Sequence, residues 1–384
     1  MGRRDTIAPP MSTIGKRKAM SLFAGAGGMD VGIKKAGFEV LAEIEIDKYC
    51  CQTLRATKER ERASTQVIEA DIRAVEPENV AGLLDIKQGE LDLLFGGPPC
   101  QPFSLAGKQN GLGDARGPLL FEIIRFAEYL RPKAILLEQV KGLMSAKGEN
   151  GERGGVFNQF LLELGRIGYA PKWKVCCAAD YGVPQLRDRV FVVALCGQNR
   201  FEFPESTHAP QSEANNLFGL PPYTTVEEAL KGLGEPKPKT LGTTFQNCED
   251  SHVDVTPPRD RERISFVPEG SYLAAQTHVG EDIRCGLMPK DTTKYLRLDR
   301  RKPSNTLRCG EIFFHPTQDR YLTPREYMRL HGYDDDYKLM GPIRSRTGKV
   351  KYLDQHRQVA NSVPPPLAYA LGEKIMECLD EQNL

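Results

Sequence analysis

The sequence predicts an α/β fold followed by a smaller, irregular domain. From Ala19 to Cys196, short apolar runs alternate with amphipathic segments of helix length, as they do in a parallel α/β sheet. A glycine-rich turn follows the first apolar run, which is typical of sheets that bind ligands at the ends of their strands. After Cys196, proline and polar residues become frequent and the alternation fades. We therefore expect a domain boundary near Cys196.

Composition narrows the functional classes. At 384 residues the chain can hold two domains, and its 52 Lys+Arg against 51 Asp+Glu indicate no partner by overall charge. No apolar run approaches the ~20 residues of a membrane span, and the first residues lack the hydrophobic region of a signal peptide, so we expect a cytoplasmic protein. Ten cysteines without a Cys-x-x-Cys pair argue for reduced, mostly buried thiols and against a zinc site.

The first two expected strands frame a small-molecule site. Residues 20–24 and 38–46 are predicted as strands, joined by a tight turn at 25–28 and a helix. Glycines at such a turn let the backbone approach a ligand, and an acid about 20 residues later fits a ribose hydroxyl. Glu45 lies at that distance. Asp30 replaces the third glycine of the dinucleotide fingerprint, which disfavours nicotinamide binding.

The remaining elements follow from apolar runs and helical periodicity. Expected strands precede Asp71 and cover 91–95, 133–137, 173–178 and 190–195, and expected helices cover 119–131, 157–167 and 363–378.

Four side chains are candidates for chemistry at the ends of these strands. Residues 96–107 contain three prolines that hold an extended loop and present Cys100, whose thiolate is the strongest nucleophile among side chains. Glu138 ends a later strand, where a carboxyl group is a candidate acid. Arg187 and Arg189 alternate along an extended segment, so we expect both to point the same way.

Residues 96–107 resemble the catalytic loop of the DNA cytosine-5 methyltransferases, whose signature is a Pro-Cys dipeptide followed by Gln and Phe-Ser. Other motifs of that family recur in order along nearly the whole chain. They are Phe23-Ala24-Gly25-Ala26-Gly27, Glu138-Gln139-Val140, Gln185-Leu186-Arg187-Asp188-Arg189, residues 321–332 and residues 358–365. The family usually has Asn at position 139 and Gly at position 360, so Gln139 and Ala360 depart from its pattern. The resemblance implies a Rossmann-like S-adenosylmethionine-dependent methyltransferase domain of the bacterial restriction-modification type.

The resemblance also implies roles for single residues. Cys100 would be the nucleophile, Glu138 the acid, Arg189 the contact to the cytosine carbonyl and Arg187 a support for the adduct. Cofactor contacts would come from Phe23, Gly25, Gly27, Glu45, Ile46, Asp71, Ile72, Pro98, Leu119, Asn361 and Ser362. DNA contacts would come from Gln101, Ser104, Arg297, Arg300, Arg301 and Arg308.

The last four of these lie in a basic run. Residues 284–308 hold eight basic side chains against Asp291 and Asp299, together with Tyr295. A charge run is usually a solvated face, but this one lies where the family keeps its target-recognition region, which favours contact with DNA phosphates. The chain would then divide into a basic mobile arm (1–18), a catalytic and cofactor-binding domain (19–196), a target-recognition domain (197–355) and a C-terminal segment (356–384) that completes the catalytic domain.

The expected activity is methylation of carbon 5 of a cytosine in duplex DNA by a monomer. A tRNA cytosine methyltransferase shares the motifs and remains an alternative, and so does a catalytically silent DNA-binding relative, suggested by Gln139 and Ala360. The sequence contains no second catalytic module, so a paired restriction endonuclease would be a separate chain.

Overall fold

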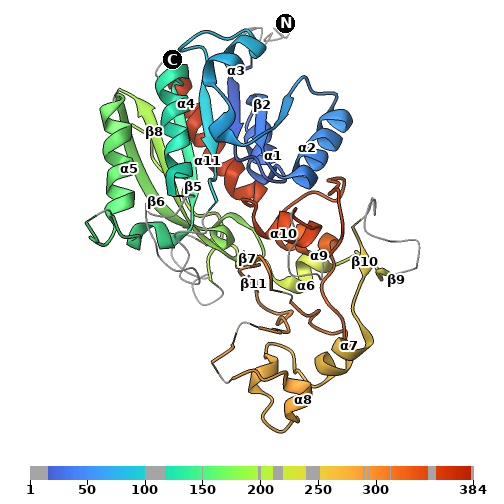
Figure 1. The fold of residues 1–384 in the computed structure, drawn as a ribbon. Coiled ribbons are helices and arrows are strands. Elements are labelled where there is room, and N and C mark those ends of the chain that lie inside the picture. Colours follow the sequence, from blue (N-terminus) through green and yellow to red (C-terminus); the bar gives the residue numbers. More distant parts are fainter. Residues whose placement is uncertain are drawn as a thin grey trace, which may run out of the picture.

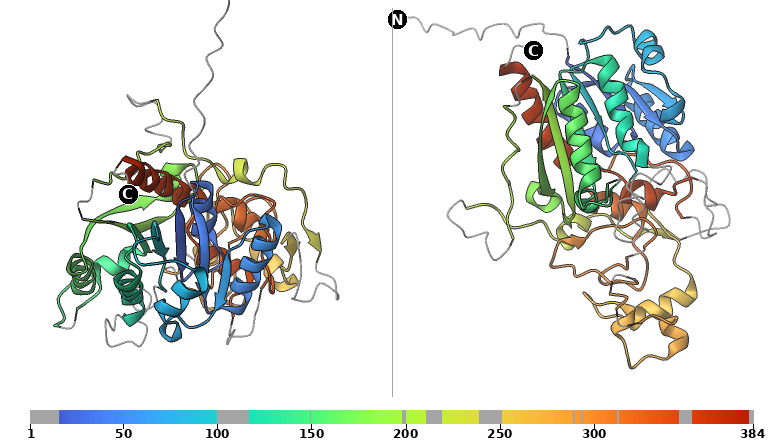
Figure 2. Two further views of the ribbon diagram at one scale, coloured as in Figure 1. Left: turned by 90° about the horizontal axis from the view of Figure 1, so that it is seen from above. Right: turned by 60° about the vertical axis from the view of Figure 1, so that its left-hand side comes forward.

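The structure is a computed structural model. It describes residues 16–99, 117–148, 150–197, 200–210, 219–238, 251–288, 290–292, 294–311, 313–344 and 352–381. An α/β sheet domain carries a second lobe at one of its ends (Figures 1 and 2).

The sheet has seven strands in the order β3-β2-β1-β4-β5-β8-β6. The strands are β1 (Lys18–Leu22), β2 (Glu39–Glu45), β3 (Gln66–Glu69), β4 (Leu93–Gly96), β5 (Ala134–Gln139), β6 (Tyr169–Cys177) and β8 (Asp188–Cys196). β1 to β5 pair in parallel, as expected, but β8 runs antiparallel to both β5 and β6. The expected α/β fold is confirmed, but the reversed direction of β8 was not anticipated. The link from β6 to β8 is too short for the crossover that a parallel neighbour requires.

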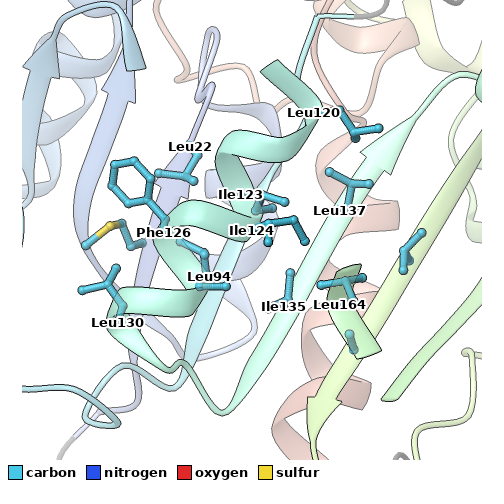
Figure 3. Close-up of a cluster of buried hydrophobic side chains, with 14 of the residues drawn as sticks. Leu22, Leu94, Leu120, Ile123, Ile124, Phe126, Leu130, Ile135, Leu137 and Leu164 are labelled. Carbon is cyan, nitrogen blue, oxygen red and sulfur yellow. The ribbon is translucent and has the colours of Figure 1, made fainter. Parts of the chain in front are cut away.

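Two hydrophobic clusters cover opposite faces of the sheet. Along β5, Ile135 and Leu137 enter one cluster, while Ala134 and Leu136 enter the other. This alternation is what a strand buried on both faces requires. The first cluster packs against α4 (Glu122–Leu130), as Figure 3 shows for the side chains between that helix and the sheet.

Two helices on the sheet were not expected. α2 (Lys48–Glu61) is rich in charge, and α3 (Pro77–Leu84) is short. The start of α2 does carry a local signal, because the Asp47 carboxylate accepts hydrogen bonds from the backbone N–H groups of Tyr49 and Cys50. α5 (Gly155–Arg166) matches an expected helix. All eight cysteines in the described part of the chain are free thiols, but only Cys50, Cys51 and Cys176 are buried, so the expectation of mostly buried thiols was wrong.

The last helix, α11 (Pro365–Glu381), packs against α1 (Gly28–Lys35). A Cβ at Gly32 would lie 2.5 Å from Ala368 Cβ, so the two helices approach closely. The division of the chain into domains stays a prediction, although this contact supports the return of the C-terminal segment to the sheet domain.

The second lobe consists of short elements around two small clusters. It contains α6 (Val226–Leu230), β9 (Lys237–Pro238), β10 (Val253–Asp254), α7 (Pro258–Ser265), α8 (Glu281–Arg284), β11 (Ser304–Asn305) and α9 (Pro324–Leu330), and α10 (Gln355–Ala360) follows it. One cluster also includes Ala26 and Cys50 of the sheet domain. β11 pairs with β7 (Gln185–Leu186), so the lobe is joined to the sheet domain by both apolar contacts and a ladder. In the described part of the chain, no helix has the length and apolarity needed to cross a bilayer.

Candidate functional site

Glu138 and most of the predicted cofactor residues lie where the parallel strands β1 to β5 end. This edge of an α/β sheet is the usual place for ligands, because the loops that follow the strands meet there. Cys100, Gln101 and Ser104 lie outside the described residues, so the structural account of the predicted loop stops at Pro99. Within the described chain, no cluster of histidine, cysteine and carboxylate side chains is arranged to hold a metal ion.

The turn after β1 leaves open space on one side. Phe23, Gly25 and Gly27 all have positive φ, of 56°, 55° and 74°. A Cβ at Gly25 would meet nothing within 4 Å, whereas one at Gly27 would lie 2.8 Å from the Tyr337 hydroxyl. Gly25 therefore faces space that a ligand could fill, and Gly27 is packed against the protein.

Glu45 holds this turn from the end of β2. Its Oε2 accepts a hydrogen bond from Gly25 N–H at 2.7 Å, and its Oε1 accepts from the N–H groups of Ile46 and Asp47 at 2.9 and 2.8 Å. Burial raises the pKa of Glu45, and these donors oppose that shift. The neighbouring Ile46 side chain is 62% exposed. An acceptor beside an exposed apolar side chain and an open glycine fits a nucleoside, with its polar ribose and flat base.

Asp71 and Ile72 follow β3 at the same edge. The Asp71 carboxylate caps a short 3₁₀ helix, η1 (Ile72–Ala74), and forms an ion pair with Arg73. Hydrogen bonding from Arg73 lowers the pKa of Asp71. Ile72 is buried, and Leu119 is half-buried in η3 (Gly117–Phe121).

The end of β4 lies directly against the end of β5. A Cβ at Gly97 would be 3.0 Å from Glu138 Oε2, so the carboxyl group packs on backbone. Gln139 Nε2 donates to the Pro98 carbonyl at 2.9 Å, and Gln139 Oε1 accepts from Val140 N–H at 2.8 Å. The buried Gln139 side chain therefore makes a positioning contact with the predicted loop, despite departing from the family's Asn.

Glu138 is paired with Arg189. Arg189 Nε lies 2.9 Å from Glu138 Oε1, and both side chains are mostly buried. A second ion pair, Lys141 to Asp188 at 2.6 Å, runs between the same two chain segments but is more exposed. Glu138 and Arg189, both of which the sequence analysis identified as candidate site residues, are thus in direct contact.

Arg187 has different surroundings. Its guanidinium is 2% exposed and donates to the carbonyl groups of Leu307, Ala360 and Ser362 at 2.9 to 3.1 Å. The strand is interrupted at Arg187, between β7 and β8, so the alternation of side chains along a strand does not make Arg187 and Arg189 point the same way. The structure places Arg187 as a link between three chain segments, and its support of an adduct stays a prediction.

Gln185 and His331 extend this link, and sequence reasoning assigned neither a role. Gln185 Oε1 accepts from Leu307 N–H at 3.0 Å, and its Nε2 lies 2.9 Å from His331 Nδ1. Burial and the nearby Arg187 lower the pKa of His331 well below its usual range. The neutral ring therefore accepts at Nδ1 and donates from Nε2 to the Ser362 carbonyl, at 3.0 Å.

The C-terminal motif lies beside the turn after β1. Asn361 is exposed at the end of α10, whereas Ser362 is buried and its hydroxyl donates to the Val359 carbonyl. A Cβ at Gly28 would lie 2.9 Å from Ser362 Cβ, which places this motif against the start of α1.

The basic run divides into buried and exposed arginines. Arg297 is buried, and it donates to the carbonyls of Ile264, Val267 and Pro316. Its expected contact with DNA is corrected here, because its guanidinium is already engaged inside the lobe. Arg300, Arg301 and Arg308 are 46%, 78% and 54% exposed, and each forms an ion pair with an acid 3.3 to 3.7 Å away. Such exposed pairs are weak and leave these arginines accessible to an anion.

Comparison with known proteins places this geometry in context. The family model described as C-5 cytosine-specific DNA methylase matches residues 17–377. Type II methyltransferase M.NgoMIV of Neisseria gonorrhoeae is 34% identical over 374 residues, which cover 95% of this chain and 99% of that protein. Type II methyltransferase M.Eco47II of Escherichia coli is 32% identical over 381 residues, with coverage of 95% and 80%. A crystal structure of a DNA modification methyltransferase encoded within an E. coli prophage has a TM-score of 0.70 and 22% identity, and the match covers 95% of this chain and 99% of that one, which supports the fold.

Proposed function

The chain belongs to the C-5 cytosine-specific DNA methylase family, and from that membership we propose that it transfers a methyl group from S-adenosylmethionine to carbon 5 of a cytosine in a specific duplex DNA sequence. It is a DNA (cytosine-5-)-methyltransferase of the bacterial restriction-modification type. The observation that carries the detailed proposal is the placement of the Glu138–Arg189 pair against the backbone that leads into Cys100.

The open side of Gly25, the Glu45 carboxylate and the exposed Ile46 fit the adenosyl part of S-adenosylmethionine. Glu45 would accept hydrogen bonds from the ribose hydroxyls, and Ile46 would cover the adenine ring. Phe23, Gly27, Asp71, Ile72, Pro98, Leu119, Asn361 and Ser362 complete the proposed set of cofactor residues. When bound, the cofactor supplies an electrophilic methyl group.

Carbon 5 of cytosine is a poor nucleophile, and the proposed residues activate it. The Cys100 thiolate attacks carbon 6 while Glu138 delivers a proton to ring nitrogen 3, so the ring electrons move to carbon 5. Arg189 would hold Glu138 in place and contact the cytosine carbonyl. After methylation, a base removes the proton at carbon 5, the ring double bond reforms and the thiolate leaves.

The described start of the loop supports the participation of Cys100, which directly follows Pro99 in the sequence. The Pro98 carbonyl accepts a hydrogen bond from the side chain of Gln139, the residue that follows Glu138 in the chain. A carboxylic acid and a thiol within reach of one ring are what the proposed activation needs.

The target base must leave the helix to reach these groups. Extrusion costs a few kcal/mol, which contacts in the pocket and with the backbone would offset. Arg300, Arg301 and Arg308 are proposed phosphate contacts on the second lobe. A cognate restriction endonuclease would be a separate chain, and we propose that the methyltransferase acts as a monomer on DNA in the bacterial cytoplasm.

The decisive test uses the order of the steps. Bisulfite sequencing of DNA from cells that express the protein would first identify the target. A duplex with 5-fluorocytosine at that site should then form a complex that survives denaturation and requires S-adenosylmethionine, because fluorine at carbon 5 cannot leave as a cation. Cys100→Ser should abolish the complex, since a hydroxyl is hardly ionised near neutral pH. If Cys100→Ser still forms it, or if methylation occurs without any trapped complex, the covalent mechanism is wrong.

Transfer to tRNA transcripts serves as the matched control for the RNA alternative. The proposal requires methyl transfer to duplex DNA and none to tRNA. Two contacts argue against a catalytically silent protein. They are the ion pair between Glu138 and Arg189 and the hydrogen bond from Gln139 to the Pro98 carbonyl.

A further inference from the structure

Tyr337 reaches the turn after β1 from a distant part of the chain. It lies in the segment after α9, is 2% exposed, and donates a hydrogen bond from its hydroxyl to the Ala26 carbonyl at 2.6 Å. Burial raises the pKa of Tyr337 well above its usual range, so the hydroxyl keeps the proton that it donates. Ala26 is itself buried.

The same turn is held from its other side by Glu45. The Glu45 carboxylate accepts from Gly25 N–H, one residue before the carbonyl that Tyr337 binds. The two contacts act on the Ala24–Gly25 and Ala26–Gly27 peptide groups, which are separated by one peptide group, one through a backbone donor and the other through a backbone acceptor. Together they fix the orientation of both peptide planes.

Close packing leaves the turn little freedom near Tyr337. The Gly27 N–H donates to the Ala24 carbonyl at 3.0 Å, and a Cβ at Gly27 would clash with the Tyr337 hydroxyl and with Leu54. With the Ala26 carbonyl directed at Tyr337, the open side of the turn is the side of Gly25. Rotation of the Ala26 peptide would change the surface that Gly25 offers to a ligand.

Tyr337 is itself well supported. Arg325 of α9 donates to the Tyr337 carbonyl at 2.9 Å, and the Tyr333 ring packs on the Tyr337 ring with 4.9 Å between centroids. The Arg60 guanidinium lies 5.7 Å from the ring centroid and also donates to the Asp336 carbonyl. These contacts hold the hydroxyl in one place, as a positioning role requires.

We propose that Tyr337 is a positioning residue for S-adenosylmethionine, acting through the Ala26 carbonyl to keep the Gly25 side of the turn shaped for the cofactor. This inference rests on the proposed function, because it requires the cofactor to bind at that turn. Tyr337 touches neither the cofactor nor the target base in this proposal.

The test compares Tyr337→Phe with Tyr169→Phe. Both changes keep the ring and remove one buried hydroxyl that donates to a backbone carbonyl at 2.6 Å, but the Tyr169 hydroxyl donates to Pro132, away from the turn after β1. Tyr337→Phe should weaken S-adenosylmethionine binding, measured by calorimetry without DNA, by about fivefold to tenfold, the effect of losing one hydrogen bond to a buried carbonyl. The KM for the cofactor should rise by the same factor, whereas kcat at saturating cofactor and the KM for DNA should stay within about twofold. Tyr169→Phe should leave the cofactor constants within about twofold.

Melting temperatures of the two variants show whether both are folded to a similar degree. Equal weakening by both changes, or an unchanged dissociation constant in Tyr337→Phe, would overturn the positioning role while leaving the proposed function intact. A wild-type protein that binds no S-adenosylmethionine would instead refute the proposed function, and this inference with it.

Discussion

Arg189 Nε lies 2.9 Å from Glu138 Oε1, and this contact joins the carboxyl end of β5 to the amino end of its antiparallel neighbour β8. β8 is the strand whose direction the sequence did not reveal. Its reversal brings the residues at its start, rather than those at its end, to the edge where the parallel strands finish. The Glu138 carboxyl group and its cationic partner meet for that reason.

Glu138→Gln should lower kcat by about 100-fold or more, because an amide cannot deliver the proton that the ring needs as charge develops. DNA affinity should change by less than about threefold, since the replacement side chain has the same size and shape. Single-turnover methylation and a binding titration measure the two effects. Lys141→Ala, which breaks the exposed Lys141–Asp188 pair, is the control and should keep nearly full activity. A Glu138→Gln enzyme with normal kcat would remove Glu138 from the mechanism.

Gln139→Leu should slow formation of the 5-fluorocytosine complex by about tenfold to 100-fold, because the Pro98 carbonyl loses its buried donor. Cofactor binding should not change. Gln139→Asn keeps the amide on a shorter side chain, so it should slow formation of the complex less than Gln139→Leu does. Rates of complex formation under single-turnover conditions rank the wild type and the two variants. A Gln139→Leu rate equal to the wild-type rate would show that the contact does not position the loop.

Glu45→Ala should weaken S-adenosylmethionine binding by about tenfold to 100-fold and leave DNA binding nearly unchanged, because it removes both a charged acceptor and the support of Gly25 N–H. Glu39→Ala, at the opposite end of β2, is a matched control that should alter neither constant. Calorimetry with cofactor and a separate DNA titration make the comparison. Equal loss of both affinities in Glu45→Ala would mean that the cofactor pocket has been misplaced.

Asp30 should make stability depend on pH. Its side chain is 1% exposed in α1, and burial, followed by repulsion from Glu43, raises its pKa to about 8. Because this pKa lies above the unfolded value of about 3.9, the folded state holds the proton more tightly. The free energy of unfolding should therefore fall as pH rises from about 4 to about 8, and the fall should stop above pH 8.

Asp30→Asn removes this ionisation. The variant should melt at a higher temperature than the wild type at pH 8.5, and its advantage should shrink as the pH is lowered towards 5. Thermal unfolding across that range provides the measurement. An advantage that is constant with pH, or that grows in acid, would contradict the assignment of the shift to Asp30.

Arg300 and Arg301 should contribute to the salt dependence of DNA binding. Replacing both with Ala should weaken binding to all sequences and reduce the slope of log K against log salt by about 2, roughly one for each phosphate contact. Arg297→Ala is the contrast, because Arg297 donates to three carbonyls inside the lobe and its loss should lower the melting temperature. An unchanged slope in the double variant would indicate that this basic run is an ordinary solvated surface without phosphate contacts.

Much of the candidate site at the strand ends could be predicted from short stretches of sequence. Buried parallel strands appear as apolar runs, so β1, β2, β4 and β5 were found where expected, and their ends located Gly25, Glu45 and Glu138. α2 was missed because its composition is mostly charged and only Asp47 marked its start. The arginines of the basic run could not be told apart by sequence either. Arg297 is buried and donates hydrogen bonds to backbone carbonyls, whereas Arg300 is exposed.

The separation along the chain explains which contacts could be inferred. Gly25 and Glu45 are 20 residues apart, within one strand-helix-strand unit, and turn chemistry with strand length predicts that they meet. Tyr337 and Ala26 are 311 residues apart, and Arg187 reaches carbonyls 120 to 175 residues away. Side-chain periodicity reports only on neighbours along the chain, whereas these contacts exist because the second lobe and the C-terminal segment pack back onto the sheet.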